Sequence, residues 1–399
     1  TASASYKVYY PGQSGNQDQV IISANQSQSE PNITAHFGTS GDCGTADATG
    51  TVGGKSFSFQ LEHQAAILVF EPFTKNDVFK NCYLTKVEVT ADNNIAGNYT
   101  LDPSNGEITG TGSDKQIILT TKGSGAYADG FKLDNSTSST TADKIYMFIK
   151  PGTHKLKIRY WLKDLVTGTE GTITKAPGSF TYDKNTYYDM TADLDTRAYS
   201  GHDYYMWDAQ QNYWYQHEWN VTNVSDRWQP TLSTQPANPN YPQNKTVDPA
   251  RWYNDHNPGS GNSYEAQTIS FKALPNANEM AWYAMKGDSR WDADELWTVF
   301  GHLYKGGRWF KKKTKIAGFT DAHIPNNLRT QYQYINVHSF NAGLPSASEM
   351  EDYFYLPNLA FYISGALNNF PWRGCYWSSS AEPGTGDNAY SMFFNSLSV

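Results

Sequence analysis

Apolar and polar residues alternate with a period of two through much of the first half of the chain. Residues 155–163 read Lys-Leu-Lys-Ile-Arg-Tyr-Trp-Leu-Lys, and residues 56–61 alternate in the same way. This alternation is typical of a strand that buries one face. Ile145–Ile149 is apolar on both faces, which predicts a central strand, and Pro151-Gly152 after it is a turn signal.

Turn signals separate further short strands. Residues 99–101 and 107–109 flank Pro103-Ser104-Asn105-Gly106, which predicts a hairpin because Asn-Gly tolerates the positive φ that tight turns need. Strands at intervals of about ten residues, without helical periodicity, are typical of a β-sandwich. We therefore predict a mainly β sandwich domain over residues 1–197.

The second half contains a repeated heptapeptide. Residues 274–280 and 344–350 agree at Leu, Pro, Ala, Glu and Met. In each copy the third residue, Asn or Ser, can cap a helix while the Glu reaches back to the cap, which is the pattern of a capping box. The repeat therefore predicts two short helices, which continue through residues 282–285 and 353–355.

Other segments of this half complete an α+β pattern. Asp292-Ala293-Asp294-Glu295-Leu296-Trp297 resembles a helix start, since acidic residues are favourable at the positive end of the helix dipole. Residues 374–380 and 389–394 read as strands. We predict an α+β domain with two short helices over residues 268–399.

Tryptophan marks a boundary between the halves. Trp161 is the only tryptophan before residue 200, and the other eleven of the twelve follow it. The boundary is expected near residues 196–201. Residues 198–267 are rich in Tyr, Trp, Asn, Gln and Pro, unlike a flexible Gly/Ser linker. We expect this segment to pack on the second domain; the alternative is that its rings are simply the core of a loop-rich domain.

Charge and hydropathy exclude two classes of partner. Charged residues make up 18% of the 399 residues and the net charge is -8, which disfavours binding to nucleic acid. The longest apolar run, residues 65–70, is far shorter than the roughly 20 residues that span a bilayer. The chain begins Thr-Ala-Ser-Ala-Ser, so we expect any signal peptide or lipid anchor to lie upstream, and membrane attachment to occur only through such an anchor.

The spacing of the three cysteines indicates no metal or redox site. Cys43, Cys82 and Cys375 form no C-x-x-C pair, so zinc and thioredoxin-like sites are not indicated. Cys43 and Cys82 are the only pair within one predicted domain and could form a disulfide. Buried free thiols are the favoured interpretation.

No catalytic motif is present. The nine histidines form no H-E-x-x-H pair, and no G-x-S-x-G turn surrounds Ser378-Ser379-Ser380. We therefore expect no catalytic residue, no cofactor and no enzymatic activity. Glu382, Asp387 and Asn388 supply oxygens in one loop, which makes them a weak candidate for calcium.

Aromatic rings are the better binding candidates. The flat face of a tryptophan can stack on a sugar ring while neighbouring Asn or Asp side chains bind its hydroxyls. The candidate ligand-binding residues are Trp207, Trp214, Trp372, Trp377, Asp387 and Asn388.

The first half resembles the Bacteroidetes fimbrillin (Mfa-like) family. The resemblance rests on four stretches in the expected order, residues 59–70, 84–89, 97–102 and 145–162, and on the closing residues 181–190. It implies two transthyretin-like β-sandwich modules, of which the first is incomplete at its N-terminus here, and export as a lipoprotein. It also implies assembly into pili, in which an N-terminal strand is removed by proteolysis and replaced by a strand from another subunit.

The second half is similar to two related groups, the Fibrobacter-paralogous domains and the formylglycine-generating-enzyme-like domains. The similarity rests on residues 344–350, 374–380 and 388–390, and it implies a C-type-lectin-like fold. The chain ends soon after a strand that the family usually continues past. Formylglycine-generating enzymes also use a cysteine pair, and this half holds only Cys375, which argues against that activity.

Together these features predict a cell-surface adhesion protein, exported to the outer membrane or fimbrium. A tip or accessory subunit of a type V pilus is the favoured role, with other pilus subunits and a surface glycan or protein as partners. One alternative is a surface lipoprotein that captures glycans for uptake without polymerising. A second is an enzyme related to formylglycine-generating oxidases.

Overall fold

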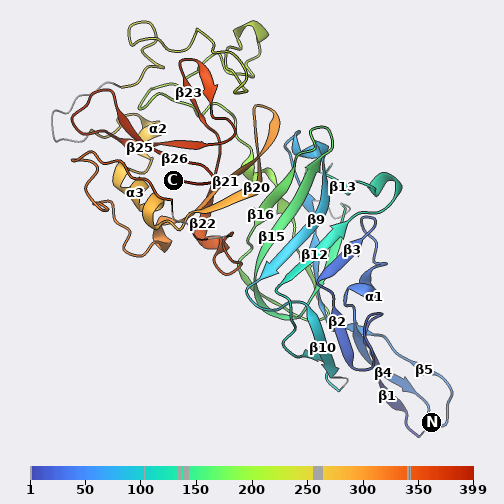
Figure 1. Ribbon diagram of the computed structural model, residues 1–399. Helices are drawn as coiled ribbons and strands as arrows, with labels where there is room; N and C mark the ends of the chain where they lie inside the picture. The colour runs from blue at the N-terminus through green and yellow to red at the C-terminus, as the bar shows by residue number, and fades with distance from the viewer. Residues whose placement is uncertain are drawn as a thin grey trace. The chain divides into compact units, whose positions relative to one another are not determined.

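The structure is a computed structural model that describes residues 2–102, 104–133, 137, 143–254, 264–338, 341 and 343–399 (Figure 1). The chain divides into two compact units. The first unit comprises Thr1–Arg197 and Ser346–Glu351, and the second comprises Ala198–Pro345 and Asp352–Val399. The fold is mainly β, as predicted, with short helices and several sheets.

The first unit is built around two sheets. Its larger sheet has the strand order β16, β15, β9, β12, β3, with β13 on β9 and β17 on β15. These strands are β3 (Asn25–Gln28), β9 (Cys82–Ala91), β12 (Gln116–Thr121), β13 (Phe131–Lys132), β15 (Gly152–Asp164), β16 (Glu170–Lys175) and β17 (Ser179–Tyr182). The second sheet has the order β14, β7, β18 and consists of β7 (Ala66–Phe70), β14 (Ile145–Ile149) and β18 (Tyr187–Asp189).

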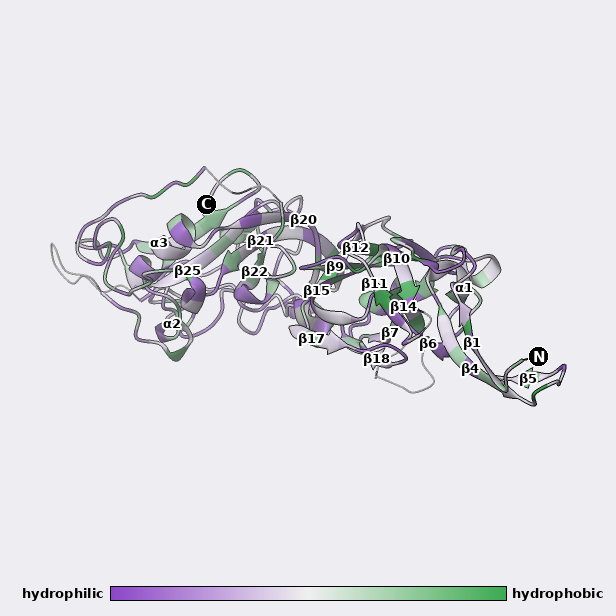
Figure 2. Ribbon diagram, turned by 90° about the horizontal axis from the view of Figure 1, so that it is seen from below, coloured by the Kyte–Doolittle hydropathy of each residue, from purple (hydrophilic) through white to green (hydrophobic). Residues whose placement is uncertain are grey.

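The core of this unit lies between the two sheets. The Phe70 ring of β7 meets the Tyr160 ring of β15 edge-on, with 6.0 Å between their centroids. Both rings are buried, as are Val87 and Val89 of β9. Strand β14 is drawn in hydrophobic green in Figure 2. Because two sheets pack their apolar faces together, this part of the chain is a β-sandwich.

Smaller sheets complete the first unit. They are formed by β1 (Ser5–Tyr10), β4 (Gly44–Gly50), β5 (Phe57–Ser58) and β6 (Glu62–His63); by β2 (Gln19–Ile22), β10 (Gly97–Asp102) and β11 (Glu107–Thr109); and by β8 (Pro72–Phe73) and β19 (Ala192–Asp193). One short helix, α1 (Phe37–Ser40), precedes β4. Strands β10 and β11 form the predicted hairpin, although Pro103 lies outside the described residues.

Strand β14 corrects one prediction. It was expected to be central, but it pairs with β7 alone among the described strands. Its other edge is covered by side chains: Gln26 accepts from the Phe148 backbone N–H at 3.0 Å and donates to its carbonyl at 2.8 Å. Gln28 accepts from the Tyr146 N–H at 2.9 Å. The strand is apolar on both faces because Phe37 of α1 packs on one of them, 4.7 Å from the Phe148 ring.

Two alternating segments also differ from expectation. Residues 155–163 lie in β15, but Lys157 and Arg159 are only 9% and 7% exposed, so the polar face is buried too. Arg159 is accommodated there because its Nη2 donates to Thr172 Oγ1 at 2.7 Å. Of residues 56–61, only Phe57–Ser58 forms a strand.

The second unit contains one three-stranded antiparallel arrangement and two hairpins. Its elements are α2 (Ile269–Lys272), α3 (Ala277–Lys286), β20 (Arg290–Val299), β21 (His302–Lys311), β22 (Tyr353–Pro357), β23 (Phe361–Ile363), β24 (Ala366–Asn368), β25 (Gly374–Ala381) and β26 (Ala389–Phe394). Strand β21 pairs with β20 and β22, β23 with β24, and β25 with β26. Trp282 and Tyr283 of α3 share a buried cluster with Phe310 and Phe394.

The repeated heptapeptide forms a helix in one copy only. Asn276 and Glu279 make the complete capping box that begins α3. In the second copy, Ser346 and Glu349 make a single turn, and the following residues enter β22 instead of a helix. The predicted helix over residues 353–355 is wrong because these aromatic residues pair with β21, and aromatic side chains favour a pleated surface.

The predicted helix start at 292–297 is also wrong. These residues lie in β20, where the pairing register shifts between Asp292 and Leu296. The Asp292 carboxylate accepts from the backbone N–H groups of Asp294 and Glu295, at 3.0 and 3.2 Å. The residues that resembled a helix cap therefore close a bulge in a strand, since an aspartate can bond to following N–H groups in either setting.

Several other expectations concern single features. The three cysteines are free thiols, so the Cys43–Cys82 disulfide is absent; Cys43 and Cys82 are buried, as favoured, whereas Cys375 is half-buried. Within the described ranges, no helix has the length and apolar character needed to cross a membrane.

Candidate functional site

A groove of about 660 Å³ lies in the second unit, along β26. We call it the β26 groove. One wall is α3, another is the segment of residues 332–336, and the loop between β25 and β26 closes one end. All residues of β26 contribute to the lining.

Three tyrosines give the β26 groove its aromatic surface. Tyr332 and Tyr334 are 55% and 74% exposed. The Tyr332 ring stacks on Tyr390, with 6.2 Å between centroids and 17° between planes. Neighbouring exposed rings in one groove offer a partner a large apolar area to bury.

Polar groups surround these rings. Glu382, Asp387 and Asn388 line the groove from the β25–β26 loop, and the loop is closed by a bond from the Glu382 N–H to the Asn388 carbonyl at 2.9 Å. Asp387 and Asn388 are exposed. Burial, reinforced by the nearby Glu382 carboxylate, raises the pKa of Tyr390 to about 12. The Tyr390 hydroxyl therefore keeps its proton at neutral pH.

The structure gathers part of the predicted binding set in this groove. Trp377, Asp387 and Asn388 all line it, together with Glu382. The half-buried Trp377 ring is fixed by a bond from its Nε1 to the Tyr205 carbonyl at 2.9 Å. These residues come together because β25 and β26 form a hairpin whose connecting loop carries the polar side chains.

The other predicted tryptophans lie elsewhere. Trp207 and Trp214 are only 6% and 1% exposed, so neither ring has a face open for stacking on a sugar. Trp207 packs instead with Phe271, and its Nε1 donates to the Ser378 carbonyl at 2.9 Å. Trp372 is 73% exposed but does not line the groove, although its neighbour Arg373 does.

The calcium candidate, Glu382, Asp387 and Asn388, gains no further acidic ligand from the described residues that line the groove. Glu382 and Asp387 are the acidic residues of the groove. Across the described part of the chain, no three His, Cys, Asp or Glu side chains are grouped so as to hold a metal ion. Calcium sites usually take six to eight oxygen ligands, so we do not include calcium in the proposed site.

Sequence reasoning did not identify the exposed tyrosines. Tyr332 and Tyr334 lie in the run Gln331-Tyr332-Gln333-Tyr334, where large rings alternate with amides in a segment without regular secondary structure. That pattern was the available signal, because rings that have no strand or helix to pack in are candidates for exposure.

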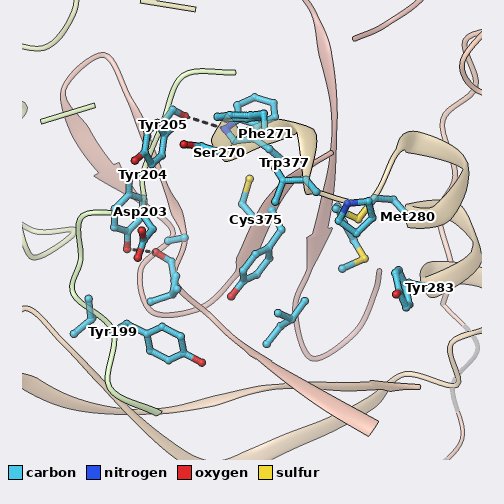
Figure 3. Close-up of a pocket in the computed structure, with 18 of the residues that line it drawn as sticks. Tyr199, Asp203, Tyr204, Tyr205, Ser270, Phe271, Met280, Tyr283, Cys375 and Trp377 are labelled. Carbon is cyan, nitrogen blue, oxygen red and sulfur yellow. Dashed lines mark hydrogen bonds between the residues drawn. The ribbon is translucent and has the colours of Figure 1, made fainter. Parts of the chain in front are cut away.

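A second cavity, of about 500 Å³, lies in the same unit (Figure 3). We call it the aromatic cavity. It is lined by five tyrosines, by Phe271 and Phe354, and by Met280 and Met392; the tyrosines are Tyr199, Tyr204, Tyr205, Tyr283 and Tyr376. Trp377 lines both this cavity and the β26 groove.

The thiol in the aromatic cavity is not activated. Burial raises the pKa of Cys375 to about 12, so the thiolate that acts as nucleophile or metal ligand is scarce at neutral pH. The other cysteines, Cys43 and Cys82, belong to the first unit. Nothing in the lining of this cavity indicates a second cysteine beside Cys375.

Comparison with known proteins gave partial structural similarities. No family model matches the chain, and no curated protein matches it. Three solved structures are similar to part of it: candidate cell adhesion proteins from Bacteroides ovatus (12% identity, TM-score 0.29), Bacteroides uniformis (14%, 0.29) and Bacteroides fragilis (13%, 0.30). The alignments cover 48%, 47% and 47% of this chain and 62%, 66% and 59% of those chains. The chain therefore spans less than two thirds of the length of the structures it matches.

Proposed function

We propose that this chain is a cell-surface adhesion protein that binds a glycan in the β26 groove. The observation that carries the proposal is the pair of exposed rings, Tyr332 and Tyr334, beside carboxylate and amide oxygens in one groove. A sugar presents apolar C–H faces and polar hydroxyls, so it is bound well by flat rings next to hydrogen-bonding groups.

The charges of the groove favour one class of glycan. Glu382 and Asp387 supply two carboxylates, and Arg373 supplies one cation. Acidic sugars would meet like charge there, whereas neutral and amino sugars would not. We therefore expect a neutral or amino-sugar glycan as the ligand.

A glycan array probed with the full chain tests this proposal. We expect binding that is concentrated on neutral or amino-sugar structures and that falls in the variant Tyr334→Ala. The matched control is Trp372→Ala, which removes an equally exposed ring that lies outside the groove lining. Binding to acidic glycans alone, or to none, would contradict the proposal.

We further propose that the protein acts as a tip or accessory subunit of a pilus assembled by strand donation. In strand donation an added strand binds through its main chain, and its alternating side chains set the register. Strand β1 supports this role, because it pairs with β4 along one edge and with no other described strand. The second unit would then carry the adhesive groove, at the exposed end of the pilus.

Immunogold labelling of sheared pili distinguishes this role from its alternative. Gold particles at pilus ends or along pili are the expected result. Labelling confined to the cell surface, with none on pili, would instead favour a lipoprotein that captures glycans without polymerising.

A further inference from the structure

The aromatic cavity adjoins the groove proposed for glycans and shares Met280, Trp377 and Met392 with it, but the rest of its lining has a different chemistry. Asp203 is the sole residue with a charged side chain among the described residues that line it; no Lys, Arg, His or Glu is present there. Asp203 is exposed, so the cavity reaches solvent where this carboxylate lies. Figure 3 shows Asp203 beside Tyr204, with Trp377 and Tyr283 farther away on the other side of the cavity.

The walls of this cavity offer ring faces and few free polar atoms. The Tyr204 hydroxyl donates to the Leu359 carbonyl at 2.7 Å, and the Tyr376 hydroxyl donates to the Pro357 carbonyl at 2.7 Å. The Trp377 N–H is likewise bonded to a backbone carbonyl. Because these polar atoms are already bonded within the protein, an occupant of the cavity would meet mainly the carbon atoms of these side chains.

Aromatic faces and one carboxylate together select for positive charge. The face of a tyrosine or tryptophan ring carries negative potential, which attracts ammonium groups held near it. The Asp203 carboxylate adds a full negative charge at the open end, where Ser200 Oγ is its bonded neighbour at 3.2 Å. A cavity of about 500 Å³ has the size of a small-molecule site.

We propose that the aromatic cavity binds an organic cation, a protonated or quaternary amine that carries an apolar body. The apolar body lies against the tyrosine and methionine side chains, and the amine lies near Asp203. This site does not depend on the glycan proposal, since Asp203 and the five tyrosines of the cavity do not line the β26 groove.

Isothermal titration of the full chain with benzyltrimethylammonium tests the proposal. The neutral comparison is para-tert-butylbenzyl alcohol, which has similar bulk and no charge. We expect saturable binding of the cation and weaker binding of the alcohol. No saturable binding of the cation, or equal binding of both compounds, would overturn the proposal.

Two adjacent positions on α2 provide a matched pair of variants. Ser270 and Ile269 are both exposed, but only Ser270 lines the cavity. Ser270→Trp should place a large ring in the cavity and abolish binding, whereas Ile269→Trp should leave the affinity unchanged. Since both positions are exposed, neither variant is expected to disturb folding. Unchanged binding by Ser270→Trp would place the cation elsewhere and overturn the proposal.

The carboxylate is tested by Asp203→Asn at low salt. We expect the affinity for benzyltrimethylammonium to fall about twofold to fivefold, which is within the range of an exposed ion pair. Tyr334→Ala, in the β26 groove, should not change it. Equal affinity in Asp203→Asn, or a matching loss in Tyr334→Ala, would contradict the assignment of the cation to this cavity, whatever the outcome of the glycan array.

Discussion

Asp288 illustrates how a single carboxylate joins distant parts of the second unit. It accepts hydrogen bonds from the Tyr353 hydroxyl at 2.6 Å, from Asn341 Nδ2 at 2.6 Å and from Arg290 Nη2 at 2.9 Å. Burial alone would raise the pKa of Asp288, but these hydrogen bonds and the Arg290 charge outweigh it and lower the pKa to about 2. The ionised form is therefore the one that the fold stabilises.

This shift predicts a pH-dependent stability. The folded pKa lies below the ordinary value of 3.8, so the contribution of Asp288 is present above that value and is lost as the pH falls towards 2. We expect Asp288→Asn to lower the free energy of unfolding by about 2 kcal/mol at neutral pH. The difference from wild type should shrink towards zero near pH 2.

Urea titrations at several pH values, followed by tryptophan fluorescence, measure this effect. Eleven of the twelve tryptophans follow residue 200, so the signal reports mainly on the second unit. Asp294→Asn is a matched control, because Asp294 only makes a surface ion pair with Lys305 at 3.3 Å, which contributes little. A pH-independent effect of Asp288→Asn would contradict the assigned role.

The cysteines give a second prediction at this scale. Burial raises the pKa of Cys43, Cys82 and Cys375 to about 12 in each case. Ellman's reagent at about pH 8 should therefore react slowly with the native protein, because the thiolate is the reactive form. All three thiols should react after unfolding. A single reactive thiol in denaturant would reveal a Cys43–Cys82 disulfide and contradict the structure.

The exposure of individual side chains could not be predicted from the sequence. Trp207 and Trp214 were chosen as binding residues for their ring type, but both are buried. Tyr332 and Tyr334 were not chosen, yet they are exposed in the groove. Ring type indicates what a side chain can bind, whereas only tertiary packing determines which face stays open to a ligand.

At the scale of elements, the repeated heptapeptide shows where local signals are insufficient. The capping box at Asn276 was predicted correctly and begins α3. The same residues at Ser346 lead into β22, because Tyr353–Pro357 pairs with β21. A cap contributes about 1 kcal/mol, and the pairing of a five-residue strand outweighs that preference.

The two copies provide a direct comparison. Asn276→Ala removes the side-chain bond to the Glu279 N–H at 3.0 Å and should lower the free energy of unfolding by about 1 kcal/mol. Ser346 begins no α-helix, so Ser346→Ala should change the free energy of unfolding by less than about 0.5 kcal/mol. On heating, circular dichroism should show that the helical signal is lost at a lower temperature in Asn276→Ala than in wild type, and at the wild-type temperature in Ser346→Ala. Equal effects in both variants would contradict the difference between the copies.

Strands were predicted correctly where the prediction depended on residues adjacent in the sequence. The β10–β11 hairpin and the β25–β26 segments were predicted from turn residues and apolar runs. The position of a strand within its sheet was not. Ile145–Ile149 has the composition of a central strand, but Gln26 takes the place of a neighbouring strand at its edge. These hydrogen bonds join residues that are far apart in the sequence, so no local pattern of residues could predict them.

Across the whole molecule, we propose different roles for the two units. The first is a β-sandwich whose strand β1 has an open edge for assembly, which is our proposal for its role. The second holds the β26 groove and the aromatic cavity. The low content of charged residues, 18%, and the concentration of tryptophan in the second half agree with recognition through rings and hydroxyls.

The assignment of the glycan to the β26 groove is tested by the affinity of the full chain for the glycan selected on the array. Titration calorimetry should compare wild type with Tyr334→Ala and Trp372→Ala. Loss of the exposed Tyr334 ring should weaken binding by about 1 kcal/mol, roughly fivefold, while loss of Trp372 should leave it unchanged. Equal affinity in wild type and Tyr334→Ala, or a loss confined to Trp372→Ala, would contradict the assignment of the glycan to the β26 groove.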